Sequence, residues 1–128
     1  MFMRFTVHKN DEDSGRRQGI FIALEELRDS GLLLDHEHRE YEQTVKWFNE
    51  NLEKPKSFSR SSRPHAKRVA LSWYKDTAIE HIARMHTLSH ILEAHGIFVD
   101  VLSTERPGYV VYEDMFQVTA EPFKETAT

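Results

Sequence analysis

The segment from Val69 to Leu102 constrains the fold of this chain most, because two stretches with strand spacing flank one with helical spacing. Apolar and polar residues alternate in Val69–Tyr74, and the alternation returns in Ile97–Leu102, as is typical of β-strands. From about Thr77 to His95, apolar residues recur every three or four positions, and Gly96 is a common helix terminator. This order predicts two neighbouring or near-neighbouring parallel strands that are joined by a helix.

Alternation elsewhere predicts three more strands. The first includes Met3, Phe5 and Val7, and the last two cover Tyr109–Tyr112 and Phe116–Ala120. We therefore expect one α/β (α+β) domain over residues 1–128. Its single mixed sheet would have about five strands in the order β-α-α-β-α-β-β-β, with helices mainly on one face.

Two helices are predicted between the first strand and Val69. Helical spacing at residues 20–27 indicates one helix, which Asp13 or Ser14 would cap and Gly31 would end. The second helix would have Asp35 as its N-cap and end near Lys54-Pro55.

The two tryptophans are expected to differ in burial. Trp73 shares a strand face with Val69 and Leu71, whereas Trp47 lies at the edge of the apolar stripe of the second helix. Trp73 should be the more buried of the two.

The second face of each predicted strand mixes polar and aromatic residues. It is too polar for a second full core and too aromatic for a face left to water. Two interpretations remain open, a concave binding surface with aromatic anchors, or a face covered by a helix or a second subunit. The residues are Arg4, Thr6 and His8; Ala70, Ser72 and Tyr74; Phe98, Asp100 and Leu102; Val110 and Tyr112; Gln117, Thr119 and Glu121.

Positive charge is concentrated in one segment. Six basic residues and no acidic one lie between Lys54 and Arg68, in a chain whose formal net charge is −4. Ser and Pro are frequent there, so a loop is predicted. Arg60, Arg63, Lys67 and Arg68 are our candidate contacts to phosphate oxygens. The alternative is a solvated surface loop that binds nothing.

Other candidate sites are weaker. Gly15-Arg16-Arg17 would offer an anion site if a helix began there, but the acidic residues Asp11–Asp13 precede it. His86 and His90 share a helix face, yet Thr87 stands where the HExxH zinc motif needs glutamate. We expect the histidines, including His81 and His95, to lie at the surface or beside the core. We predict no metal site and no cofactor.

Composition narrows the class of protein further. The chain has no cysteine, which excludes disulfides, a thiolate nucleophile and cysteine-ligated metals. No apolar stretch is long enough for a signal peptide or a transmembrane helix, so we expect a cytoplasmic protein without membrane contact.

Several longer segments together resemble a family of small bacterial proteins of unknown function. The resemblance implies a bacterial cytosolic protein, and it transfers no activity and no catalytic residue. The segments that carry it are residues 10–17, 47–49, 73–75, 106–114 and 117–123.

Three hypotheses of function follow. The first is a non-catalytic binding or regulatory module for a phosphate-bearing ligand, a nucleotide or nucleic acid, with Tyr74, Asp100 and Tyr112 assisting the basic segment. The second is a small enzyme that uses the polar sheet face around these three residues and His8, although no catalytic motif is present. The third is a homodimeric interaction module that associates through the same face.

Overall fold

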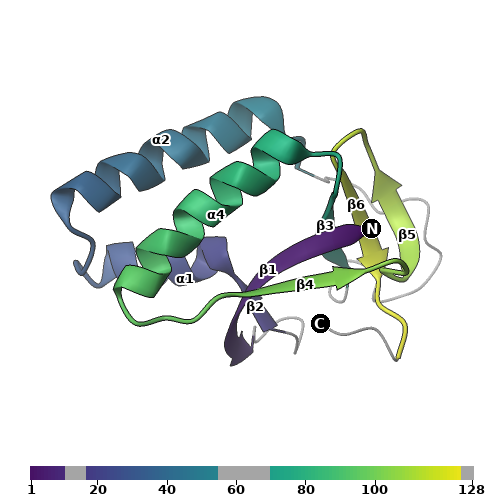
Figure 1. Cartoon of the computed structure of the whole chain (residues 1–128), viewed down its shortest axis with the longest axis horizontal. Helices are drawn as coiled ribbons and strands as arrows, with labels where there is room; N and C mark the ends of the chain where they lie inside the picture. Colours follow the sequence, from purple (N-terminus) through teal and green to yellow (C-terminus); the bar gives the residue numbers. More distant parts are fainter. Residues whose placement is uncertain (11–16, 55–69, 125–128) are drawn as a thin grey trace.

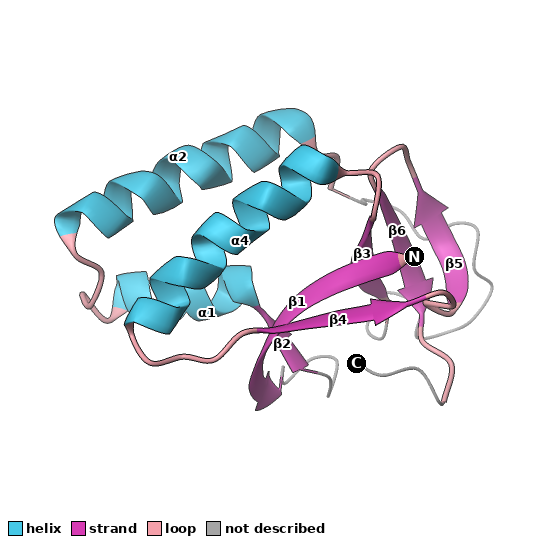
Figure 2. Ribbon diagram, viewed as in Figure 1, coloured by secondary structure: helices cyan, strands magenta, loops and turns pink. Residues whose placement is uncertain are grey.

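The computed structural model describes residues 1–10, 17–54 and 70–124, which form three helices and six strands of one sheet (Figure 1). The helices gather at one side of the molecule and the strands at the other (Figure 2). The predicted α+β domain with a single sheet is confirmed. In chain order the elements are β1 (Phe2–Asn10), β2 (Arg17–Gly19), α1 (Ile20–Asp29), α2 (Asp35–Asn51), β3 (Leu71–Lys75), α4 (Ile79–Ala94), β4 (Asp100–Thr104), β5 (Tyr109–Glu113) and β6 (Gln117–Glu121).

Strand β1 organises the sheet, since it pairs with β2, β3 and β4. The remaining pairs are β3 with β6 and β6 with β5, and every pair is antiparallel. Because β3 and β4 are both antiparallel to β1, they run in the same direction with β1 between them. The predicted strand–helix–strand unit is therefore confirmed in its near-neighbour form, with α4 as the connecting helix.

Strands β2 and β3 pair with different parts of the same edge of β1 and leave a stretch between them. Thr6 pairs with both Gly19 of β2 and Asp100 of β4, so these strands lie on opposite edges of β1. Strand β3 pairs with the start of β1, through Met3 and Tyr74, on the same edge as β2. Between Met3 and Thr6 this edge has no strand partner among the described residues, so the sheet has a gap there.

The start of α1 differs from the prediction. The helix begins at Ile20 with Gly19 at its N-cap, so neither Asp13 nor Ser14 caps it. Arg17 lies instead in the short strand β2, which is held by pairing with β1. The candidate anion site at Gly15-Arg16-Arg17, which required a helix to begin there, therefore loses its basis, since α1 begins at Ile20. The second helix has Leu34 rather than Asp35 at its N-cap, and it ends earlier than expected, at Asn51.

The main core lies between the helices and one face of the sheet. Phe5 and Val7 of β1 pack there with apolar residues of α1, α2 and α4. Side chains that are directly opposite in antiparallel strands point to the same face. Tyr74 pairs with Met3 and packs against this core, so it lies on the helix side of the sheet.

The faces of β3 and β6 are the reverse of those predicted. Because Tyr74 faces the helices, its neighbour Trp73 faces away from them, together with its partner Val118. Ser72 and Thr119, which we placed on the polar face with His8, lie on the helix side. All five residues of β6 are buried, so this strand has no solvated face. The predicted order of burial is confirmed, since Trp73 is 1% exposed and Trp47 is half-buried.

Candidate functional site

The predicted site residues do not come together in the described structure. Arg60, Arg63, Lys67 and Arg68 lie outside the described residues. Tyr74 is on the helix side of β3, and Asp100 begins β4 on the other side of the sheet. Tyr112 lies on β5, separated from Asp100 by several strands. The described chain therefore offers no single polar site that is built from Tyr74, Asp100 and Tyr112.

Asp100 is held between two basic side chains. Its Oδ2 lies 2.8 Å from Nε2 of His8 and accepts a hydrogen bond from Nη1 of Arg17. The bond with His8, followed by that with Arg17, lowers the pKa of the Asp100 carboxyl, although partial desolvation opposes the shift. His8 also contacts the exposed ring of Phe98. These interactions give Asp100 a role in joining β1, β2 and β4.

Tyr112 belongs to the turn that joins β5 and β6. Its hydroxyl donates to Oδ2 of Asp114 at 2.8 Å, and this bond, followed by burial, raises the pKa of Tyr112. Oδ1 of Asp114 accepts the backbone N–H groups of Phe116 and Gln117. Nε2 of Gln117 donates to the carbonyl of Glu53, just after α2. Tyr112 therefore helps to fix this hairpin against the end of α2.

The gap beside β1 opens into a cavity of about 400 Å³. It lies between the sheet and the helices α1 and α2, and most of its walls are apolar or aromatic. A cavity of this size with few polar groups is the usual form of a small-molecule site. The apolar walls include Phe5, Ile20, Phe21, Tyr41, Val45, Phe48, Leu52, Tyr74 and Met85.

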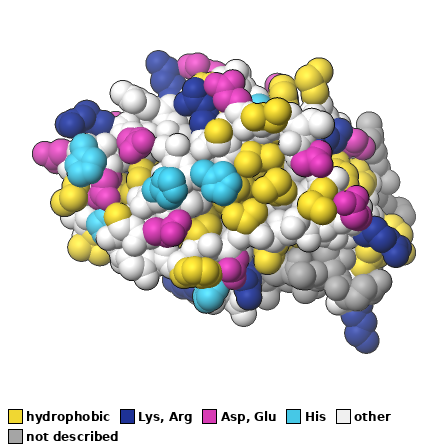
Figure 3. All heavy atoms as spheres, viewed as in Figure 1, with side chains coloured by type: hydrophobic (Ala, Val, Ile, Leu, Met, Phe, Trp, Pro, Cys, Tyr) yellow, Lys and Arg dark blue, Asp and Glu magenta, His cyan; other side chains and the backbone are white. Residues whose placement is uncertain are grey.

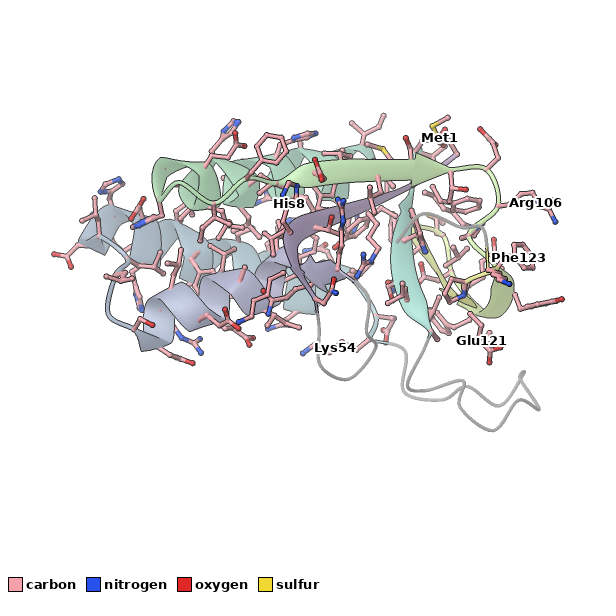
Figure 4. The ribbon with its side chains drawn as sticks, turned by 90° about the horizontal axis from the view of Figure 1, so that it is seen from below. Met1, His8, Lys54, Arg106, Glu121 and Phe123 are labelled. Carbon is pink, nitrogen blue, oxygen red and sulfur yellow. The ribbon has the colours of Figure 1, made fainter. Side chains whose placement is uncertain are left out.

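Polar side chains also line this cavity, and the charged ones among the described residues balance, with Glu25 and Glu53 against Arg4 and Lys54. Arg4 lies in the gap itself, is mostly buried, and donates from Nη2 to the carbonyl of Arg17. Ser72 shares a hydrogen bond of 3.0 Å with Thr119. Lys54, labelled in Figure 4, lines the cavity and is the one residue of the basic segment that the structure describes. The cavity therefore lies beside the chain that leads into the predicted phosphate-binding segment.

Tyr74 is the one predicted site residue of the described chain that lines this cavity. Its hydroxyl donates to Sδ of Met85, a weak acceptor, at 3.5 Å. Burial raises the pKa of Tyr74, so the phenol stays neutral at physiological pH. Tyr74 can thus offer an aromatic ring and a hydroxyl. Arg4 was missed by the sequence analysis, because its position on β1 marks it only as one member of a polar face.

His81 differs most from the prediction for the histidines. We expected it at the surface or beside the core, but it is 4% exposed and lies between the rings of Trp47 and Phe116. Its Nε2 lies 2.9 Å from the carbonyl oxygen of Asn51. Because a carbonyl only accepts, Nε2 carries the proton. His81 therefore joins α4 to the end of α2.

His95 and Glu37 form a second, partly buried contact between the end of α4 and the start of α2. Oε1 of Glu37 accepts the N–H of Leu34 at the start of α2 and lies 2.8 Å from Nε2 of His95. Glu37 is thus engaged in the fold rather than in a ligand cluster with His36 and His38. Among the described residues, no group of three histidine, aspartate or glutamate side chains could hold a metal ion.

The Glu37 contacts predict a loss of stability in acid. The bonds to Leu34 and then to His95 lower the pKa of Glu37, so its contribution is complete above the unfolded-state pKa of about 4.3 and falls as pH drops through the folded value. Glu37→Gln should lower the free energy of unfolding at pH 7 by about 1–3 kcal/mol and flatten its decline as pH falls below about 5. Urea unfolding at several pH values measures both effects, with exposed Glu40→Gln as the control. An identical acid decline in wild type and Glu37→Gln would refute the assignment.

Comparison with known protein families, curated proteins and solved structures gives no match for this chain. The resemblance to a family of small bacterial proteins therefore stays a prediction. Within the described ranges, no helix is both long and apolar enough to cross a bilayer.

Proposed function

We propose that this chain is a non-catalytic binding or regulatory module for a phosphate-bearing ligand, a nucleotide or a nucleic acid. The observation that carries the proposal is the aromatic-walled cavity with Lys54 and Arg4 among its polar groups. The basic segment starts at Lys54, and Ser72, close after its end, also lines the cavity. A ligand with an aromatic base and a phosphate matches both features, since bases stack on aromatic rings and phosphates bind Arg and Lys.

In this proposal the cavity and the basic segment have separate roles. The rings of Phe21, Phe48 and Tyr74 supply apolar surface for the base, and the cationic groups supply the charge for the phosphate. Arg60, Arg63, Lys67 and Arg68 carry most of the phosphate contacts. Nucleoside phosphates should therefore bind more tightly than inorganic phosphate.

The test compares the quadruple variant Arg60/Arg63/Lys67/Arg68→Ala with a control of equal charge, Lys9/Arg39/Lys46/Lys124→Ala. All four control residues are exposed, and none lines the cavity. Affinity for a nucleotide or a short oligonucleotide should fall at least about tenfold in the first variant and change little in the control. Both variants should unfold within about 1 kcal/mol of wild type if these side chains are solvated. Fluorescence anisotropy and thermal melts measure the two effects.

The salt dependence provides a second measurement on the same proteins. Wild-type affinity should weaken as salt rises, because phosphate contacts release counterions, and the quadruple variant should have a smaller slope. No wild-type binding to any phosphate ligand at low salt, or equal losses in the two variants, would refute the proposal. A loss of stability without a loss of affinity would show that the basic segment serves the fold.

The structure offers less to the two other hypotheses. The enzyme hypothesis needs Tyr74 and Asp100 on one face, and they lie on opposite faces of the sheet. The dimer hypothesis needs a free sheet face, whereas Trp73, Val118 and Ala120, on the face away from the helices, are already buried within one chain.

A further inference from the structure

A second hollow adjoins the cavity at the end of α2, where Asn49, Leu52 and Glu53 line both, and three parts of the chain meet there. It has a volume of about 620 Å³ and is lined by the end of α2, the start of α4 and the β5–β6 turn. We call it the acidic groove. The buried ring of His81 contributes to its lining, and the bond between Gln117 and the Glu53 carbonyl ties two of its walls together. The groove is therefore a fixed feature of the fold.

The edges of the groove are unusually apolar for a surface. Ile79 and Met115 are 76% and 75% exposed, more than any other large hydrophobic side chain of the described residues. Both belong to the lining of the groove. Figure 3 shows hydrophobic and acidic side chains next to one another over the N-terminal end of α4. Exposed apolar side chains that gather around a concave surface mark interaction sites more often than scattered ones do.

The charge of the groove has one sign. Glu50, Glu53, Glu80 and Asp114 line it, and no lysine or arginine of the described residues does so. Glu80 is paired with Arg84 and Asp114 holds the β5–β6 turn, but no ion pair among the described residues involves Glu50 or Glu53. Such a surface attracts a cationic partner, and Ile79 and Met115 would offer that partner apolar contacts.

The start of α4 adds backbone donors to the same groove. Within the described ranges no side chain caps this helix, and Ala78 occupies its N-cap position. The first N–H groups of a helix have no partner within it, so they can donate to carbonyl oxygens of a bound chain. A peptide can match all three features of the groove. Its backbone carbonyls can accept from the helix N–H groups, its basic side chains can pair with the carboxylates, and its apolar side chains can contact Ile79 and Met115.

We propose that the acidic groove is a docking site for a segment of another protein that is rich in arginine or lysine and has interspersed apolar residues. The apolar side chains pack against Ile79 and Met115. The cationic ones face Glu50, Glu53 and Glu80. The proposal does not require the phosphate-bearing ligand, since the groove is lined by four acidic side chains and no described lysine or arginine, whereas the cavity has two side chains of each sign.

The test uses a fluorescent peptide of about twelve residues that interleaves Arg and Leu with Gly and Ser. Two related peptides replace every Arg by Glu or every Leu by Ser. The whole wild-type chain should bind the first peptide at least about tenfold more tightly than either of the others. Equal affinity for the three peptides, or no binding of the Arg–Leu peptide at low salt, would refute the proposal.

Two charge-reversal variants locate the site. Glu50→Lys/Glu80→Lys changes the groove, whereas Glu40→Lys/Glu93→Lys makes the same change at exposed positions of α2 and α4 that do not line it. Affinity for the Arg–Leu peptide should fall at least about tenfold in the groove variant and much less in the control. Circular dichroism establishes that both variants are folded, and Ile79→Ser/Met115→Ser tests the apolar contribution without changing charge. Equal affinities in the two charge variants would place the binding elsewhere.

A second copy of this chain is the main alternative occupant. Sedimentation of the protein alone, at increasing concentration, measures self-association in wild type and in the groove variant. A monomer in both supports a separate partner. A dimer that forms in wild type and is lost in Glu50→Lys/Glu80→Lys would show that the groove binds another copy, and would overturn the proposal.

Discussion

Trp73→Ala should lower the free energy of unfolding by about 3–5 kcal/mol, the usual cost of removing a fully buried large aromatic side chain. Trp73 is 1% exposed, and its strand partner Val118 is equally buried. Trp47→Ala should cost less, about 1–2 kcal/mol, because Trp47 is half-buried and contributes mainly ring contacts with His81 and Arg84. Urea unfolding followed by circular dichroism measures both losses without relying on tryptophan fluorescence.

Trp73→Phe serves as a matched comparison. The indole Nε1 of Trp73 has no hydrogen-bond partner among the described residues, so replacing the indole by a phenyl ring removes packing area but no hydrogen bond. The phenylalanine variant should therefore retain more than half of the stability that the alanine variant loses. Equal losses in Trp73→Ala and Trp47→Ala would contradict the burial of Trp73.

Gly108→Ala should be similarly damaging, with a loss of at least about 3 kcal/mol, for a reason that lies in the backbone. Gly108 has a φ of +133°, a backbone angle that residues other than glycine rarely adopt. A Cβ atom there would collide with the carbonyl group of Glu121 and would lie 2.8 Å from Cα of Pro122. Figure 4 shows Glu121 and Phe123 beside the turn that carries Arg106. The close approach of Glu121 and Pro122, at the end of β6, therefore requires glycine at position 108.

Gly96→Ala separates the two contributions to this effect. Gly96 also has a positive φ, +77°, but nothing lies within 4 Å of its hypothetical Cβ. Gly96→Ala should therefore lower the free energy of unfolding by only about 1 kcal/mol, the cost of placing a residue other than glycine at a positive φ. Thermal and urea unfolding measure both losses of stability. Gly108→Ala includes a steric clash and backbone strain, whereas Gly96→Ala includes backbone strain alone. Equal losses would show that the contact between Gly108 and Glu121 has no energetic weight.

Local patterns predicted which segments form strands and helices, but not how their faces combine. Alternation correctly indicated strands at Met3–Val7 and around Trp73. It could not show which side of β3 meets the helices, because that depends on the pairing of Met3 with Tyr74, far apart in sequence. The greater hydrophobicity of Trp73 favoured the wrong side. Trp73 is buried all the same, on the other face of the sheet.

The strand β2 and the burial of His81 were unpredictable for the same physical reason. Arg17-Gln18-Gly19 has little intrinsic preference for a strand and forms one only by pairing with β1. His81 lies outside the predicted apolar stripe of α4, and its burial depends on the position of Asn51 at the end of α2. The candidate cavity was unpredictable as well, because it requires the gap between β2 and β3.

The pairing of β1 also bears on how the chain folds. Its longest ladder joins residues 2–6 to residues 100–104, at nearly opposite ends of the described chain. A ladder between such distant segments forms slowly, because a large loop must close before any of its bonds are gained. During synthesis, β1 has to wait with an unpaired edge until β4 has left the ribosome. A chaperone that shields exposed strands would therefore benefit this protein most over that interval.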